Sequence, residues 1–310
     1  MLKLIVLGAG AGGGFPQWNS AGAGCRRARA GDPAALPRTQ CALAASVDGE
    51  QWVLINAAPE LATQIAAIPA LHPRPAPGQI RHSPITAVVL TGAEVDTVTG
   101  LLSLRERHPF TLYASAASHA VLAANPIFGA LDPAIVPRRE LFLNRALMLR
   151  DAGGGPLGLT IEAYPVPGKV PLFLESRDEA EPGDEGSTIG LALRAETGGE
   201  AHIIPSCAMM TDALRDRLRG AGLVFFDGTL WRDDEMIRAG AGPKTGARMG
   251  HMSIDGEHGT LAAFAGLGVR RRVFIHLNNT NPVLLGDSPE HARVIEAGWE
   301  VAEDGMEITA

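Results

Sequence analysis

Two series of short apolar segments, separated by turn signals, most constrain what this chain can fold into. In the first half, residues 2–8, 41–47 and 51–57 have the length and composition typical of strands. Asp48 and Gly49 lie between the last two segments and form a common hairpin turn pair. Further strands are expected at residues 85–92, 110–115, 159–166, 188–196, 201–207, 223–229 and 271–279. Segments with helical spacing lie between them, at residues 58–71, 99–107, 117–125, 211–222, 255–268 and 288–298.

Two strand-rich halves, each with its own helices, predict two β-sheets packed together with helices outside. A doubly wound parallel sheet is the competing arrangement. The hairpin at residues 41–57 and a second one expected at residues 299–309 favour mixed sheets over an all-parallel sheet.

The first strand runs into a glycine-rich loop whose Gly8-x-Gly10-x-x-Gly13 spacing matches a dinucleotide fingerprint. That fingerprint requires a helix directly after the glycines and an acidic residue at the end of a second strand. Here Pro16 opposes a helix, and Asp32 lies in no apolar segment. We therefore expect no NAD site. Two interpretations stay open: a tight turn, or a loop that another group approaches closely, with N–H groups facing a ligand.

Composition limits the partners and the compartment. The 310 residues carry a formal net charge of −7 without a basic block, so nucleic acid is not an expected partner. Three cysteines indicate a reducing compartment, and no apolar run approaches the roughly 18 residues of a membrane-spanning helix. A cytoplasmic protein without a membrane span is expected. The acidic segment 174–187 is expected to form a loop, and whether it closes over a cleft is left open.

Polar side chains follow several of the predicted strands. Glu94 and Asp96 come after one buried strand, and Asp227 and Thr229 end another. The stretch RMGHMS presents His251, and a further strand end presents His276 with Asn278 and Asn279. Carboxylates and imidazoles that converge from separate strand ends are typical ligands of a metal ion. Each residue alone could equally be a cap or a hydrogen-bonding group in the core. The other seven histidines are expected at the surface.

Six sequence stretches carry a resemblance to a known family. They are GAGAGGGFPQWN, PRTQ, VDTVTGLLSLRE, VPGKVPL, FFDGTLWRDDEMIRAGAGPKTGARMGHMS and HLNNTNP, and they span almost the whole chain. On these stretches the sequence resembles the coenzyme PQQ synthesis protein B family of the metallo-β-lactamase superfold. The resemblance implies an αββα four-layer sandwich of two mixed sheets in a single domain, residues 1–310. It also implies a ligand cleft along one edge, bordered by the glycine loop.

The expected metal site departs from that of hydrolytic relatives. The H-x-H-x-D-H motif of the superfold reads here Gly92, Glu94, Asp96 and Thr97. A two-zinc hydrolase is therefore not expected. Asp96, His251 and His276 are left as catalytic and metal-binding candidates, with Glu94 or Asp227 as further ligands. Two histidines and a carboxylate are the ligand set of non-haem Fe(II) oxygenases, so Fe(II) is the expected metal. Only Cys25 is left of a Cys-rich zinc site found in the family, and we expect no structural zinc there.

The resemblance implies a role in the biosynthesis of pyrroloquinoline quinone (PQQ). The expected reaction is iron-dependent, O₂-using hydroxylation of the tyrosine-derived ring of a precursor made from a Glu–Tyr peptide. A non-catalytic carrier that helps PQQ or its precursor reach the periplasm is the alternative, and a homodimer is left open. The precursor is anionic, so basic or polar side chains are candidates for binding it, with surface solvation as the alternative. These candidates are Arg38, Lys169, Lys244, Arg248 and Asn278.

Overall fold

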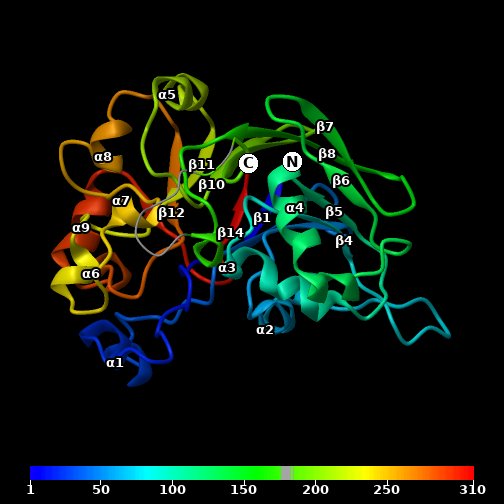
Figure 1. The fold of residues 1–310 in the computed structure, drawn as a ribbon, viewed down its shortest axis with the longest axis horizontal. Coiled ribbons are helices and arrows are strands. Elements are labelled where there is room, and N and C mark those ends of the chain that lie inside the picture. Colours follow the sequence, from blue (N-terminus) through cyan, green and yellow to red (C-terminus); the bar gives the residue numbers. More distant parts are fainter. Residues whose placement is uncertain (176–182, 184) are drawn as a thin grey trace.

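Two seven-stranded sheets pack face to face in the computed structural model, which describes residues 1–175, 183 and 185–310 (Figure 1). The first sheet has the order β14 (Glu307–Thr309), β1 (Lys3–Gly8), β2 (Ala42–Ser46), β3 (Trp52–Ile55), β4 (Ile85–Val89), β5 (Thr111–Ala114) and β6 (Arg138–Glu140). The second has the order β13 (Glu300–Val301), β12 (Arg271–Ile275), β11 (Leu223–Asp227), β10 (Glu200–Ile204), β9 (Ile189–Ala195), β8 (Pro156–Pro165) and β7 (Ala146–Arg150).

Both sheets are mixed, as the sequence predicts. In the first sheet β14, β1, β2 and β3 pair antiparallel, whereas β3 to β6 pair in parallel. In the second sheet β7 to β10 pair antiparallel, and β10 to β13 pair in parallel. The parallel strands matter most for function, because their carboxyl ends meet at one edge of the sandwich.

Alternating side chains divide the first sheet between two apolar layers. Leu4 and Val6 of β1 point into the core between the sheets, whereas Ile5 and Leu7 point to the outer layer. This two-residue period is what an amphipathic strand with both faces covered requires. The outer layer is completed by Leu61 of α2, and by side chains of the other helices on that face.

Helices cover both outer faces of the sandwich (Figure 1). The first sheet is covered by α2 (Leu61–Ala67), α3 (Val95–Val98) and α4 (Ala116–Ala124), with the 3₁₀ turns Pro69–Leu71, Thr99–Leu104 and Pro126–Ala130. The second sheet is covered by α5 (Asp212–Leu218), α8 (Thr260–Ala263) and α9 (Pro289–Glu296). The remaining helical elements are α1 (Ala23–Arg29), α6 (Glu235–Arg238), α7 (Gly246–Met249) and the 3₁₀ turns Leu172–Leu174 and Pro282–Leu284.

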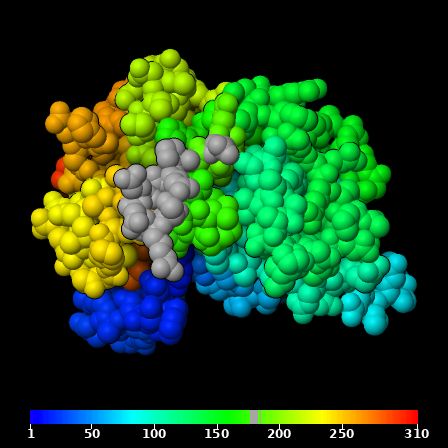
Figure 2. Space-filling view, viewed as in Figure 1, coloured from blue at the N-terminus to red at the C-terminus, as the bar shows by residue number. Residues whose placement is uncertain are grey.

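The N-terminal segment leaves the first sheet and packs on the second half of the chain. Arg27 of α1 forms a two-pronged ion pair with Asp287, and the thiol of Cys25 lies 3.6 Å from Asn279 Oδ1. Figure 2 shows this dark-blue segment beside the yellow segment around residues 231–250. The glycine loop, residues 8–14, connects β1 of the first sheet to this segment.

The glycine loop is shaped by close backbone approach. Gly10 forms single β-bridges with both Gln40 and Leu277, and a Cβ at Gly8 would lie 2.1 Å from the carbonyl oxygen of Gln40. Of the two interpretations left open, the structure supports the close approach. The N–H groups of Gly10, Ala11 and Gly13 donate hydrogen bonds to acceptors within the chain, so these three groups do not face a ligand.

Three local predictions are wrong. Residues 299–309 form no hairpin: β13 pairs with β12 and β14 pairs with β1, because the connection crosses from one sheet to the other. The helix expected at residues 99–107 is only the 3₁₀ turn Thr99–Leu104, in which Gly100 packs on the backbone of Ala57 and Ala58. His202 is not at the surface but buried on β10, with Nδ1 3.0 Å from the Tyr164 hydroxyl.

Within the described ranges, no helix combines the length and the apolar character that crossing a membrane requires. Residues 176–182 and 184 of the predicted acidic loop lie outside the described residues.

Candidate metal centre

The candidate site lies where β4, β11 and β12 end. Asp96 follows β4 at the start of α3, Asp227 is the last residue of β11, and His276 directly follows β12. These strands come from different sheets, and their carboxyl ends open into one cavity of about 560 Å³. The glycine loop forms part of its wall through Gly12 and Gly13, as the resemblance implies.

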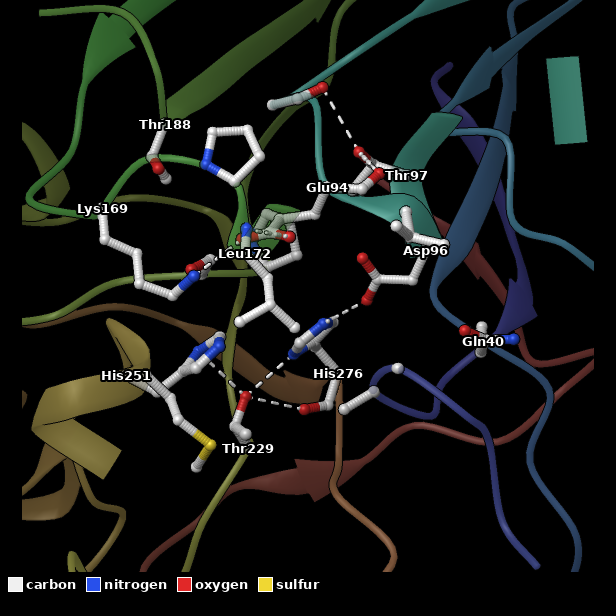
Figure 3. A pocket seen from close by; sticks show the side chains of 18 of the residues that line it. Gln40, Glu94, Asp96, Thr97, Lys169, Leu172, Thr188, Thr229, His251 and His276 are labelled. Atoms are coloured by element: carbon white, nitrogen blue, oxygen red, sulfur yellow. Dashed lines mark hydrogen bonds and ion pairs between the residues drawn. The ribbon is translucent and has the colours of Figure 1, made fainter. Parts of the chain in front are cut away.

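His276 is held in an unusual backbone conformation. Its φ angle is 62°, in the left-handed region that non-glycine residues seldom adopt. Nδ1 lies 2.8 Å from the Thr229 hydroxyl and Nε2 lies 3.0 Å from Asp96 Oδ2 (Figure 3). A strained residue whose two ring nitrogens are both engaged is typical of a functional site.

His251 is placed beside His276 by the end of α7. The helix ends at Gly250 in the left-handed conformation, φ 85°, which turns the chain toward the cavity. The two imidazole rings are stacked, with centroids 5.1 Å apart and planes 23° from parallel. Nδ1 of His251 lies 2.7 Å from Asp227 Oδ2 and 3.1 Å from the hydroxyl of Thr229.

Thr229 links the two histidines to the buried aspartate. Its hydroxyl lies 2.6 Å from Asp227 Oδ1. A hydroxyl has one proton, and a carboxylate only accepts, so this contact uses the Thr229 proton. The nearby Nδ1 of His276 then acts as a donor to Thr229, and Nδ1 of His251 donates to Asp227. This tautomer leaves Nε2 of both rings as the ligand atoms.

The carboxylates give the site its charge. Asp227 is fully buried and also accepts a hydrogen bond from the backbone N–H of Cys207. Burial opposes ionisation of Asp96, but its hydrogen bond with His276 and the charges of both histidines lower its pKa. Burial alone would lower the pKa of His276, but Asp96 and Asp227 raise it. Asp96 and His276 thus stabilise each other's charged forms.

The donor set fits a divalent metal. One ligand atom each from Asp227, His251 and His276 lie within 4.8 Å of one another, and Asp96 is a fourth donor in contact with His276. Imidazole nitrogens and carboxylate oxygens together suit Fe(II), Zn(II) and related ions. The structure thus brings four of the five predicted metal ligands together.

Glu94 is the predicted ligand that lies apart. Its carboxylate accepts from Lys169 Nζ at 2.9 Å and from the N–H of Leu172 at 3.1 Å (Figure 3). It lines the cavity but points away from the histidines toward the segment 171–175. The prediction of Glu94 as a metal ligand is therefore corrected, because a lysine across the cavity neutralises its charge.

The predicted substrate-binding residues divide into two groups. Lys169, Lys244 and Asn278 line the cavity, and Arg248 lies beside them because it shares an ion-pair partner with the two lysines. Arg38 does not line the cavity. Its guanidinium is 5% exposed and donates to the carbonyls of residues 36, 37 and 302 and to Glu303. Arg38 fastens the C-terminal segment, so the prediction that it binds substrate is corrected.

Two important residues are not among the predicted ligands or substrate-binding residues. Thr229 was found beside Asp227 at the same strand end, but its role in orienting the histidines was not predicted. Glu175 gave no signal in the sequence, because it lies in a segment that resembles a solvated acidic loop. Its side chain is only 4% exposed and forms ion pairs with Lys169, Lys244 and Arg248.

Comparisons with known proteins identify the family of the chain. Residues 51–277 match the family described as beta-lactamase superfamily domain. The coenzyme PQQ synthesis protein B of Gluconacetobacter diazotrophicus is 60% identical, with both chains covered completely. The protein of that name from Xanthomonas oryzae pv. oryzae is 53% identical over 99% of each chain.

Solved structures show the same relationship. The crystal structure of Zn(2+)-bound PqqB from Methylobacterium extorquens superposes with a TM-score of 0.92 at 46% identity, covering 99% of this chain and 100% of that one. A diphosphatase from the PhnP family, with a TM-score of 0.68 at 20% identity over 100% and 98% of the two chains, shares the fold. The fold, the paired histidines and these similarities together show that the chain belongs to the coenzyme PQQ synthesis protein B family, within the beta-lactamase superfamily.

Proposed function

We propose that this protein is an iron-dependent hydroxylase in PQQ biosynthesis. Its substrate would be the tyrosine-derived ring of a precursor made from a Glu–Tyr peptide. The observation that carries the proposal is the pair of stacked histidines beside two aspartates in a cavity with cations on its other side. The ligand set matches non-haem iron oxygenases, and the cations match an anionic substrate.

The residues that would hold the metal are His251 and His276, through Nε2, with Asp96 as the carboxylate, because the oxygens of Asp227 already accept hydrogen bonds from His251 Nδ1, Thr229 and Cys207. When bound there, Fe(II) supplies the capacity to reduce O₂ and to transfer one of its oxygen atoms. Asp227 and Thr229 keep both imidazoles in the tautomer that presents Nε2 to the cavity. Lys169 and Lys244 lie in the wall, where they can bind carboxylates of the substrate and orient its ring.

The overall reaction balances with a named reductant. An aromatic C–H becomes C–OH with one oxygen atom of O₂, and the other atom leaves as water. That second atom requires two electrons and two protons, which a two-electron reductant such as ascorbate would supply. Compared with a hydrolase, the site needs open positions for O₂ and substrate rather than a second metal.

The experiment is a turnover assay with defined metals. Protein purified without oxygen is loaded with Fe(II) or, as the control, with Zn(II), because the Methylobacterium extorquens relative was crystallised with Zn(2+). It is mixed with a Glu–Tyr dipeptide, O₂ and ascorbate. We expect mass spectrometry to find a product with one added oxygen only with Fe(II), and no product with His276→Ala. Equal product from the Zn(II) form or from His276→Ala would contradict the proposal.

A carrier is the second candidate function, favoured by one observation. Thr97 stands where the superfold motif has its last histidine, and its hydroxyl is engaged by the carbonyls of Gly92 and Glu94. A site with fewer ligands could bind the precursor without converting it. Tight binding of PQQ by the Fe(II) form together with no hydroxylation of any tested tyrosine peptide would favour the carrier.

A further inference from the structure

The cationic side of the cavity holds a carboxylate that belongs to the chain itself. Glu175 lies within 2.8 Å of Lys169 Nζ, 3.2 Å of Lys244 Nζ and 3.0 Å of the Arg248 guanidinium. Its side chain is almost completely covered, at 4% exposure. Three cations around one carboxylate form a site for a carboxylate, whichever molecule supplies it.

The segment that carries Glu175 is poorly anchored by apolar contacts. Leu172, Phe173 and Leu174 form one 3₁₀ turn and leave 56%, 47% and 48% of their surface exposed. Three exposed large apolar side chains in a row contribute little burial energy to holding a segment in place. The described polar attachments are the Glu94 bond to Leu172 N–H at one end and the Glu175 ion pairs at the other.

The cations of this cluster, Lys169, Lys244 and Arg248, are partly buried and favour an anion beside them. Lys169 is shared between Glu94 and Glu175, with side-chain exposures of 12% for the lysine and 4% for Glu175. Partly buried cations without a counter-charge cost free energy, so the departure of Glu175 is unfavourable unless another anion takes its place. A ligand carboxylate satisfies that requirement with the same geometry and charge.

We propose that Lys169, Lys244 and Arg248 form a carboxylate-binding subsite of the cavity, and that Glu175 is an internal carboxylate which occupies it and is exchanged for a carboxylate of the ligand. This inference rests on the proposed function only for the choice of a polycarboxylate ligand. It makes Glu175 a specificity residue: neutral ligands cannot displace it, whereas anionic ones can. Lys169 and Lys244 contact the ligand directly, and Glu175 acts by competition.

The competition has a measurable consequence. If Glu175 occupies the subsite about nine-tenths of the time, the apparent affinity for an anionic ligand is reduced about tenfold. Removing the charge of Glu175 while keeping its shape should therefore tighten binding. Removing one of the cations should weaken it.

The experiment measures binding of free PQQ, a tricarboxylate, to the full chain by isothermal titration calorimetry without turnover. Glu175→Gln is expected to bind PQQ about tenfold more tightly than the wild type, and Arg248→Met more weakly. Glu296→Gln, an exposed residue of α9, loses the same charge and is the matched control, expected to bind like the wild type. PQQ binding by Glu175→Gln that is equal to or weaker than wild-type binding would overturn the exchange.

A crystal structure with PQQ keeps the test decisive if Glu175→Gln disturbs the local fold. The proposal expects a PQQ carboxylate in ion-pair contact with Lys169, Lys244 and Arg248, with Glu175 displaced. PQQ bound elsewhere in the cavity with Glu175 still in place would overturn it. Both readouts are independent of hydroxylation, so a failure of the hydroxylase proposal and a failure of the subsite give different results.

Discussion

At the scale of single residues, the hydroxyl group of Thr229 orients both histidines of the site. One hydroxyl group contacts Asp227 and both histidines, and it lies 3.0 Å from the carbonyl oxygen of His276. Side chains that orient metal ligands are often as important for affinity as the ligands. The same logic makes Thr229 a better test of the proposed centre than a ligand, whose removal would abolish binding for many reasons.

Replacing Thr229 with valine should weaken metal binding by about 10- to 100-fold. Valine has the same shape but no hydroxyl, so both imidazoles lose the contact that fixes their tautomer. Thr229→Ser keeps the hydroxyl and is expected to bind metal like the wild type. Competition titrations against a chromophoric chelator measure the affinity, and valine and serine variants of equal affinity would show that the hydroxyl has no orienting role.

Glu235 gives a prediction of pH-dependent stability. Its carboxyl group is buried and accepts hydrogen bonds from Trp231 N–H and the Thr280 hydroxyl, and burial raises its pKa from 4.5 to about 7, with Arg232 opposing the shift. Between those values the folded state holds a proton that the unfolded state has lost. The free energy of unfolding therefore falls as pH rises from about 4.5 to 7, by roughly 3 kcal/mol at most.

Glu235→Gln should remove this decrease, because glutamine does not titrate. Urea unfolding at several pH values between 4 and about 8 measures it. Glu296→Gln, on the surface, is the matched control and should keep the wild-type slope. A Glu235→Gln variant with an unchanged slope would contradict the assignment of the pH dependence to Glu235.

At the scale of elements, the glycine loop is fixed by packing against two neighbouring segments. A methyl group at Gly8 would collide with the backbone of Gln40, whereas one at Gly129 has no heavy atom within 4 Å. Gly8→Ala should lower the free energy of unfolding by roughly 1–3 kcal/mol. Gly129→Ala should change it by less than about 0.5 kcal/mol. Thermal unfolding compares the two, and equal effects would show that the loop has room to adjust.

Strand positions were predictable from the sequence, whereas some strand partners were not. The apolar segments 2–8, 41–47 and 51–57 all became strands, because alternating side chains cover two apolar layers. The two C-terminal strands, β13 and β14, were predicted to form one hairpin. Instead β13 pairs with β12 in the second sheet and β14 pairs with β1 in the first. Local spacing describes a strand, but its partner depends on which sheet edge is free after the rest has folded.

The candidate site was predictable where residues end strands. Asp96, Asp227 and His276 follow from that rule. His251 was expected at a strand end too, but it follows the helix α7. The roles predicted for Arg38 and Glu94 were not found, because the sequence does not reveal the ion-pair partner of a charged residue. Arg38 pairs with Glu303 and Glu94 pairs with Lys169, and both partners lie far away along the chain. Thr229 and Glu175 act through such partners too, which is why the structure was needed to find their roles.

At the scale of the whole molecule, the C-terminal segment joins the two sheets. β13 extends the second sheet, β14 extends the first, and between them Asp304 accepts hydrogen bonds from the N–H groups of Ala9 and Thr39 and from the Thr39 hydroxyl. The apolar layer between the sheets contains side chains from both halves. We therefore predict that residues 1–310 unfold as one domain. Far-UV and near-UV circular dichroism should report one coincident transition, and two separate transitions would contradict this prediction.

The measurement that tests the central claim most directly is an anomalous-scattering map. Crystals would be grown without oxygen from protein loaded with Fe(II), and data collected on both sides of the iron absorption edge. The account predicts one strong iron peak in coordination contact with Nε2 of His251 and His276 and with a carboxylate oxygen of Asp96. A map from fully loaded protein with no peak between these side chains, or with its iron at another place in the chain, would contradict the account.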